Sequence, residues 1–165
     1  MVLLGHVDTC VENDQRFCPD GRRLGQELRS CAAAEWFASF YQGHCRYGVA
    51  AGLYRQAYDT RRKTVGIEEI STLTSMNNLA GALSYQGKYE GAEEMHRETL
   101  QLSKKVLGEE HPLTLTSMNN LADSLSHQGK YEEVEEMHQE TLQMSRKVLG
   151  EEHPSTLTSV QVNGN

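Results

Sequence analysis

The sequence predicts an all-α protein assembled from helical hairpins that stack as repeats. Two observations carry this prediction. The stretch 72–113 is followed without a gap by a near copy, 114–155, and the two differ at only nine of 42 positions. Within each copy the apolar residues recur at steps of three and four, which is the spacing of one face of an α-helix. One hairpin cannot bury its apolar face alone, so neighbouring copies are expected to stack.

The first helix of the unit is expected from Thr74 to Gln86. Gly87 ends it, because glycine readily adopts the positive φ of a helix C-terminus. Its predicted buried stripe consists of Leu73, Met76, Leu79, Ala80 and Leu83.

The second helix is expected from Tyr89 to Leu107. Its first turns are acidic and its last turn carries Lys104 and Lys105, which is the charge order that the helix dipole favours. Gly108 stops this helix, and Pro112 opens the next one at a position where a missing N–H costs nothing. The short connection implies antiparallel packing of the two helices. The predicted buried stripe is Tyr89, Ala92, Met95, Thr99, Leu102, Val106 and Leu107.

The region 22–71 is interpreted as a degenerate N-terminal repeat, with helices expected at 24–42 and 48–65. A shift of 42 residues places Tyr47 on Tyr89 and Gly66 on Gly108. Trp36 and Phe37 replace an Asn-Leu pair, so this unit is expected to be bulkier inside, and to cap the array. Before it, 1–21 is expected to form a short helix and a turn. The helix covers 1–16, and its apolar face consists of Leu3, Leu4, Val7, Cys10 and Val11.

The C-terminal residues 156–165 are interpreted as a truncated repeat. They begin a third unit in register and then abandon the pattern. No following helix then covers the outer face of the helix near 132–149. We therefore expect this helix to be the least stable part of the array and a site of self-association. The residues concerned are Val134, Met137, Leu142 and Val148.

The amino-acid composition limits the classes of partner and the cellular location that we expect. The 165 residues carry a formal charge of −7 and are 38% hydrophobic, which is typical of a foldable chain. The acidic balance argues against nucleic acid and anionic membrane as partners, since both require clustered Lys and Arg. No apolar run approaches the roughly 20 residues that span a bilayer, and the start Met1-Val-Leu-Leu is too short for a secretory signal. We expect a cytoplasmic protein.

No motif predicts catalysis, a cofactor or a bound metal. The four cysteines, Cys10, Cys18, Cys31 and Cys45, contain no C-x-x-C pair, so reduced thiols are expected over a metal site. The pairs His96-x-Glu98 and His138-x-Glu140 lack the cysteine half of a zinc deaminase signature. The Glu-Glu-His triplets ending at His111 and His153 recur at the repeat period, which favours a structural role. We expect no enzyme.

Three motifs recur in register: MNNLA at 76–80 and 118–122, QGKYE at 86–90 and 128–132, and KVLGEEHP at 105–112 and 147–154. Together they resemble the tetratricopeptide repeat, in the 42-residue form of kinesin light chains. The resemblance is good over about 72–160 and weak over 22–71. It implies a short right-handed superhelix of helical hairpins and a role in protein–protein interaction. Such arrays hold cargo adaptors in kinesin light chains, and they also follow the ATPase module of large signalling proteins.

The resemblance also implies a peptide-binding groove on the concave surface, lined by the first helix of each unit. An asparagine amide suits that task, because it both donates and accepts hydrogen bonds along an extended backbone. Alternatively, the asparagines bond to neighbouring helices inside the array. Both alternatives stay open for Asn78 and Asn120, whereas the groove is favoured for Asn77 and Asn119. The implied groove residues are Thr74, Asn77, Asn78, Gly81, Ser84, Tyr85, Thr116, Asn119, Asn120, Asp123, Ser126 and His127.

The predicted function is that of a scaffold or adaptor module that binds a peptide segment of a protein partner. The alternative is a fragment of a larger signalling ATPase or motor-adaptor array that acts by self-association through its open C-terminal face.

Overall fold

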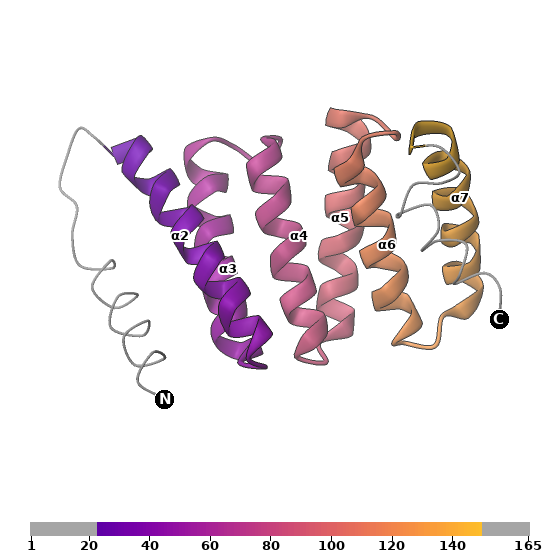
Figure 1. Cartoon of the computed structure of the whole chain (residues 1–165), viewed down its shortest axis with the longest axis horizontal. Coiled ribbons are helices and arrows are strands. Elements are labelled where there is room, and N and C mark those ends of the chain that lie inside the picture. The colour runs from indigo at the N-terminus through magenta and orange to yellow at the C-terminus, as the bar shows by residue number, and fades with distance from the viewer. Residues whose placement is uncertain (1–22, 150–165) are drawn as a thin grey trace. The chain divides into compact units, whose positions relative to one another are not determined.

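The computed structural model describes residues 23–149, and the predicted N-terminal helix at 1–16 and the stub 156–165 lie outside this range. The described residues form six α-helices and no strand (Figure 1). The all-α class is therefore confirmed. The helices are α2 (Arg23–Gly43), α3 (Tyr47–Thr64), α4 (Ile70–Tyr85), α5 (Tyr89–Leu107), α6 (Pro112–Ser126) and α7 (Tyr131–Leu149).

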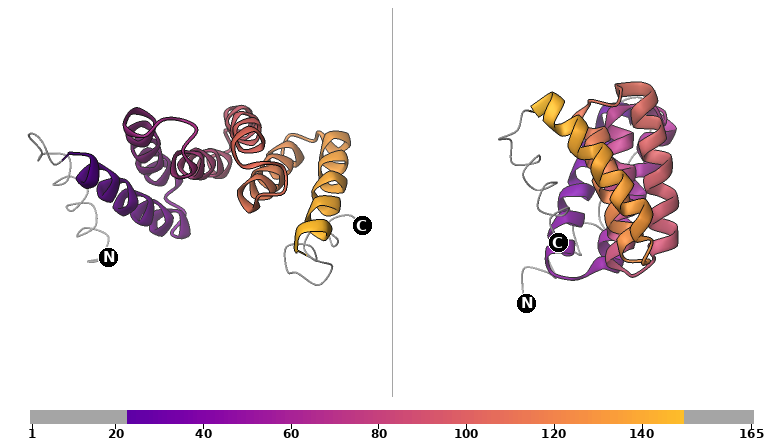
Figure 2. Two further views of the ribbon diagram at one scale, coloured as in Figure 1. Left: turned by 90° about the horizontal axis from the view of Figure 1, so that it is seen from above. Right: turned by 90° about the vertical axis from the view of Figure 1, so that its right-hand side faces the viewer.

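The chain forms two compact units, Met1–Ser75 and Met76–Asn165, which divide within α4. In the first unit α2 packs against α3. In the second unit α6 lies between α5 and α7 and packs against both (Figure 2). The finer division into repeats at 22–71, 72–113 and 114–155 stays a prediction.

The turn between the two helices of a hairpin has the same geometry three times. Gly87 and Gly129 both have a φ of 75°, and Cys45, at the equivalent position of the N-terminal hairpin, has a φ of 59°. In each turn the next backbone N–H donates to the carbonyl oxygen five residues earlier. These bonds join Arg46 to Tyr41, Lys88 to Leu83 and Lys130 to Leu125, at 2.9, 3.0 and 3.1 Å. The N-terminal hairpin thus keeps the turn although it has lost the glycine that makes a positive φ easy.

The Glu-Glu-His-Pro stretch marks the beginning of a helix. His111 is the N-cap of α6, and its Nδ1 accepts a hydrogen bond from the Leu113 N–H at 3.1 Å. Pro112 follows in the first turn, where no N–H is needed. The structural role predicted for this triplet is confirmed at His111, while His153 lies outside the described residues.

The first helix of the repeat buries the predicted stripe. Every one of its five apolar residues in α4 is at most 9% exposed. The equivalent residues of α6 are at most 4% exposed, and they are Leu115, Met118, Leu121, Ala122 and Leu125. This side of each helix forms the core because its residues recur at the helical period and remove apolar area from water.

The stripe predicted for the second helix was wrong in part. In α5, Ala92 and Thr99 are fully buried as expected, but Val106 is 39% exposed. His96 and Ser103 take its place in the interior, at 1% and 0% exposure. The buried face therefore follows the spacing 92, 96, 99 and 103, which consists of small and polar side chains. These allow close approach of neighbouring helices, whereas the apolar pattern alone pointed to larger residues.

The interior predicted for the N-terminal hairpin was also wrong. Trp36 is 65% exposed, and the buried residues of α2 are the smaller Cys31, Ala34, Ala38 together with Tyr41. Trp36 instead contacts two rings of its own helix, edge-on with Phe37 at 5.1 Å and stacked with Phe40 at 6.3 Å. Alanines are buried where α2 packs against α3, whereas the indole stays mostly exposed.

Candidate functional site

Helical spacing divides the predicted groove residues into an outer and an inner set. In α6 the outer residues follow the spacing i, i+4, i+7 and i+11, and in α4 of the second unit they occupy the equivalent places. Most are exposed, while Asn78, Gly81 and Asn120 are half-buried. We call this set the polar stripe. Its residues are Asn78, Gly81 and Tyr85 of α4, Thr116, Asn120 and Asp123 of α6, and His127, the C-cap residue of α6.

Thr74 occupies the same spacing but belongs to the first compact unit, so it is described by itself. It is half-buried, and its hydroxyl donates to the Ile70 carbonyl oxygen at 2.9 Å. Thr116 makes the equivalent bond to Pro112 at 2.9 Å. Each hydroxyl therefore has a partner in its own helix.

Asn77 lies inside the protein rather than on the groove face that we favoured. Its side chain is 5% exposed, and its Oδ1 lies 3.1 Å from Nδ1 of the fully buried His96. This contact joins α4 to α5 within the hairpin, which is the internal alternative considered for the asparagines. The asparagine amide satisfies an imidazole that would otherwise be buried without a partner. The equivalent Asn119 is half-buried, and so is Ser126.

Ser84 connects the two helices that carry the polar stripe. Its Oγ lies 3.0 Å from Oγ of Ser124, so the C-terminal end of α4 lies beside α6. Ser124 stands where the preceding unit has Ala82, which means that this bond depends on one of the nine differences between the copies. Ser84 is thus engaged between helices, and it places the two halves of the polar stripe next to each other.

An aromatic pair lies at the end of the polar stripe. The rings of His127 and Tyr89 stack with centroids 4.9 Å apart and planes 23° from parallel. Nδ1 of His127 lies 2.9 Å from the Asp123 carbonyl oxygen and 3.9 Å from its carboxylate. The pattern had assigned Tyr89 to the buried stripe of α5, and nothing in the sequence indicated its contact with His127. The stripe therefore ends in an exposed carboxylate beside a stacked imidazole.

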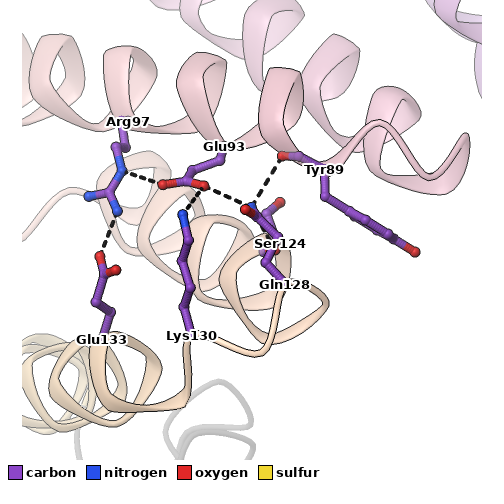
Figure 3. A network of polar contacts seen from close by, with 7 residues as sticks. All are labelled: Tyr89, Glu93, Arg97, Ser124, Gln128, Lys130 and Glu133. Atoms are coloured by element: carbon purple, nitrogen blue, oxygen red, sulfur yellow. Dashed lines mark hydrogen bonds and ion pairs between the residues drawn. The ribbon is translucent and has the colours of Figure 1, made fainter.

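A polar network centred on Glu93 holds α5 against the hairpin turn that follows His127 (Figure 3). One carboxylate oxygen accepts from Nε2 of Gln128 and from Nζ of Lys130, both at 2.7 Å. The other oxygen accepts from Nε of Arg97 at 2.9 Å. Arg97 also donates to Glu133 of α7 at 2.6 Å.

The network keeps Glu93 ionised. Burial alone would raise the pKa of this carboxyl group, but the hydrogen bonds from Lys130, Gln128 and Arg97 outweigh it and lower the pKa from 4.5 to about 2. Gln128 extends the network to the carbonyl oxygens of Tyr89 and Ser124, at 3.4 and 3.3 Å. These contacts fix the turn beside His127 and Tyr89, and with it the end of the polar stripe.

The described residues include no group of three His, Cys, Asp or Glu side chains placed to hold a metal ion. Cys31 is buried, with its thiol 3.7 Å from the Ala57 carbonyl oxygen, and Cys45 is exposed. Cys10 and Cys18 lie outside the described range. Over the described part of the chain, no helix combines the length and the apolar character needed to cross a membrane.

Repeated helical hairpins define the chain as an α-helical repeat protein, because each has a turn of the same geometry between its two helices and the buried core stripe recurs. A comparison with family models agrees, because the model of the tetratricopeptide repeat matches residues 29–105, 71–147 and 118–161. The chain belongs to the tetratricopeptide repeat family and is of the kinesin-light-chain-like type.

Solved structures show the same fold. The nearly identical tetratricopeptide-like repeats of a Podosopora anserina protein assigned as a kinesin light chain are 29% identical, with a TM-score of 0.75. The match covers 81% of this chain and 63% of that one. BtubC (BKLC) from P. vanneervenii is 20% identical with a TM-score of 0.77, over 97% of this chain and 62% of that one. The chain thus spans less than two thirds of the length of either structure. No curated protein matches.

Membership of this family implies a general kind of function. Tetratricopeptide repeats mediate protein–protein interactions, and proteins of this kind are typically scaffolds without catalysis.

Proposed function

We propose that the chain is a protein-interaction module whose polar stripe holds an extended peptide segment of a partner. One observation supports this proposal above the others. The side chains of Thr116, Asn120, Asp123 and His127 recur on one side of α6 without joining the core, next to the equivalent side chains of α4. Such a row suits a ligand that is itself extended and periodic.

The chemistry of the polar stripe indicates the kind of peptide. The amides of Asn78 and Asn120 can donate to and accept from a peptide main chain. Asp123, whose side chain is 69% exposed, offers a carboxylate to a Lys or Arg of the ligand. The stripe itself contains no Lys or Arg. The proposed ligand is therefore an extended segment with at least one basic residue.

Two glycines allow a matched test. Gly81 lies in the polar stripe, and Gly91 lies in α5 of the same hairpin, away from the stripe. A Cβ added at either position meets no atom within 4 Å, and neither has a positive φ. Arginine is a better helix former than glycine by roughly 0.5–1 kcal/mol, so both variants should keep or gain helicity. They add the same charge and bulk on different surfaces.

The experiment selects linear peptides for binding to the full chain by display, and then measures their affinity for Gly81→Arg and Gly91→Arg. We expect Gly81→Arg to weaken binding strongly and Gly91→Arg to leave it unchanged. Asn120→Ala should also weaken binding with helicity intact. Peptides that bind the two arginine variants equally well, with circular dichroism showing folded protein, would contradict the proposal. Loss of the fold in Asn120→Ala would assign that residue a structural role.

Self-association through α7 is the second candidate. Val134 and His138 are half-buried, whereas their equivalents in α5, Ala92 and His96, are at most 1% exposed. Partly exposed apolar residues on an array's last described helix favour contact with a further copy. Light scattering over a range of concentrations tests this candidate. A monomer at every concentration would contradict it without affecting the peptide-binding proposal.

A further inference from the structure

One side of α2 is only partly buried although the same side of α4 and α6 is fully buried. Four positions define it: Ser30, Ala33, Phe37 and Phe40, which we call the α2 outer face. Ala33 is exposed and the other three are half-buried. Their equivalents in α4 are all 0% exposed, and they are Thr72, Ser75, Leu79 and Ala82. In α6 the equivalents are at most 2% exposed, and they are Thr114, Ser117, Leu121 and Ser124.

The structure shows which element covers this side in α4 and in α6. This side of α6 is covered by the preceding hairpin, because α5 packs against α6 and Ser84 of α4 contacts Ser124. At the start of α4 this side is covered by α3, because the Arg61 guanidinium of α3 donates to the Ser75 hydroxyl oxygen of α4. The covering element thus comes each time from the chain immediately before the helix. For α2 that chain is the segment 1–22.

The segment 1–22 has the composition and length for this place. Its sequence predicts a helix over 1–16 with one apolar face, followed by a turn directly before α2. A helix of 16 residues is about 24 Å long, and the eleven residues from Ser30 to Phe40 span about 15 Å. The turn at 17–22 would bring the segment back along α2 as an antiparallel neighbour. The apolar residues offered by the two sides are then complementary, with leucine and valine facing two phenylalanines.

We propose that the N-terminal segment 1–22 docks on the α2 outer face, where it takes the place of the second helix of a preceding hairpin. Phe37 and Phe40 are the main contact residues on α2. Leu4 and Val7 are the main contact residues on the segment. The docked segment covers the α2 outer face, which keeps its aromatic surface from associating with other chains.

Two neighbouring alanines test this directly. Ala33 lies in the α2 outer face, whereas Ala32 lies at the register of Thr74 and Thr116 and outside it; both are exposed. Cysteine is introduced at one or the other in the full chain, and the rate of thiol labelling is followed by tandem mass spectrometry, whose fragment ions separate the introduced cysteine from the neighbouring Cys31 and from Cys45. We expect Ala33→Cys to react about tenfold or more slowly than Ala32→Cys, equivalent to about 1.4 kcal/mol of protection.

Changes in the segment supply the second half of the test. Leu4→Asp with Val7→Asp should raise the labelling rate at Ala33→Cys to that of Ala32→Cys, while Thr9→Asp, on the opposite side of the predicted helix, should not. Trp36, the single tryptophan of the chain, stacks on Phe40 and reports the same event. Its emission should shift to longer wavelength in the double variant.

Two outcomes overturn the proposal. Equal labelling of the two introduced cysteines in the otherwise unchanged chain shows that nothing covers the α2 outer face. Slow labelling at Ala33→Cys that is lost on dilution shows that a second copy covers it in place of the segment. Circular dichroism on every variant confirms that the hairpin itself is folded.

Discussion

Arg97 of α5 donates to Glu133 of α7 over 2.6 Å, and both residues stand at positions where the two near-identical copies differ. The equivalents of this pair are Gln139 in the second copy and Gly91 in the first. The ion pair therefore exists only when the first copy precedes the second. With the Ser84–Ser124 contact, it makes the interface between two copies specific for their order although the copies are nearly the same.

We expect the Arg97–Glu133 pair to determine the order of the two copies and to contribute little to the free energy of unfolding. Both side chains are about half exposed, at 44% and 49%, and exposed ion pairs contribute about 0.2–1 kcal/mol. A double-mutant cycle with Arg97→Gln and Glu133→Gln, followed by urea unfolding, should return a coupling energy in this range. The exposed pair Lys104–Glu140 serves as a comparison. A coupling of several kcal/mol would contradict this expectation.

Glu93 is expected to matter more, because its side chain is only 13% exposed and three donors converge on it. Glu93→Ala removes the shared acceptor of Lys130, Gln128 and Arg97 and should lower the free energy of unfolding by about 1–3 kcal/mol. The pKa of Glu93 is about 2 in the folded protein, below the ordinary 4.5. Its contribution is therefore complete above pH 4.5 and is lost as the pH falls toward 2.

Chemical unfolding at a series of pH values measures the contribution of Glu93. The unchanged protein should lose stability between pH 4.5 and 2 more steeply than Glu93→Gln does. Glu98→Gln, at an exposed position of the same helix, is the control. Parallel curves for the unchanged protein and Glu93→Gln would show that the network does not depend on the charge.

His96 predicts a second pH dependence at higher pH. Burial lowers the pKa of His96 from 6.5 to about 4. The unfolded chain then binds a proton near pH 6.5 that the folded protein takes up only near pH 4, so stability falls as the pH drops through this interval. The loss is roughly 1.4 kcal/mol for each unit of pKa difference. His96→Gln should remove it while keeping a polar partner for Asn77.

Ser103→Ala is the matched control for His96, because it alters another fully buried polar residue of α5 and titrates nothing. The Ser103 hydroxyl has no hydrogen-bond partner among the described residues, so this variant should be neutral or slightly stabilising. An unchanged pH profile in His96→Gln would show that the imidazole is not held neutral in the folded state.

Arg61 is expected to be the most sensitive charged position of the first unit. It is 8% exposed, pairs with Glu35, and donates to the Ser71 carbonyl oxygen at 3.2 Å. Arg61→Leu leaves the Glu35 carboxylate in a mostly buried place without its cation, which typically costs about 3–5 kcal/mol. Thermal unfolding should show a large loss for Arg61→Leu and almost none for the exposed neighbour Arg62→Leu. Adding Glu35→Gln to Arg61→Leu should recover part of the lost stability.

Leu121→Asp tests the packing of α6. Leu121 is 2% exposed and its helix lies between α5 and α7. An unpaired carboxylate there is strongly unfavourable, so the second unit should lose helicity and melt at lower temperature. Asp123→Leu, two residues along on the exposed side, should leave the melting temperature nearly unchanged. A Leu121→Asp protein that melts like the unchanged one is incompatible with the observed core.

The sequence by itself determined the class of the fold and the approximate position of the helices, although α4 begins at Ile70 and not at the expected Thr74. The bounds of α5, Tyr89–Leu107, agree with the prediction, because a glycine stop and the dipole-favoured charges mark both ends. The apolar stripe of α4 is also as predicted, since its large aliphatic residues recur at the helical period. The apolar periodicity of one helix can be read from its own sequence, and the second copy shows the same pattern again.

Only the tertiary structure decided which polar residues lie inside. Asn77 and His96 are buried together although 19 residues separate them, and Ser103 is buried where the pattern favoured Val106. Trp36 shows the reverse case of a large apolar residue that stays exposed. A helix in a stack is covered from more than one side, and small or paired polar residues fit where helices approach closely. Which side is covered depends on neighbouring hairpins, which the periodicity of a single helix does not describe.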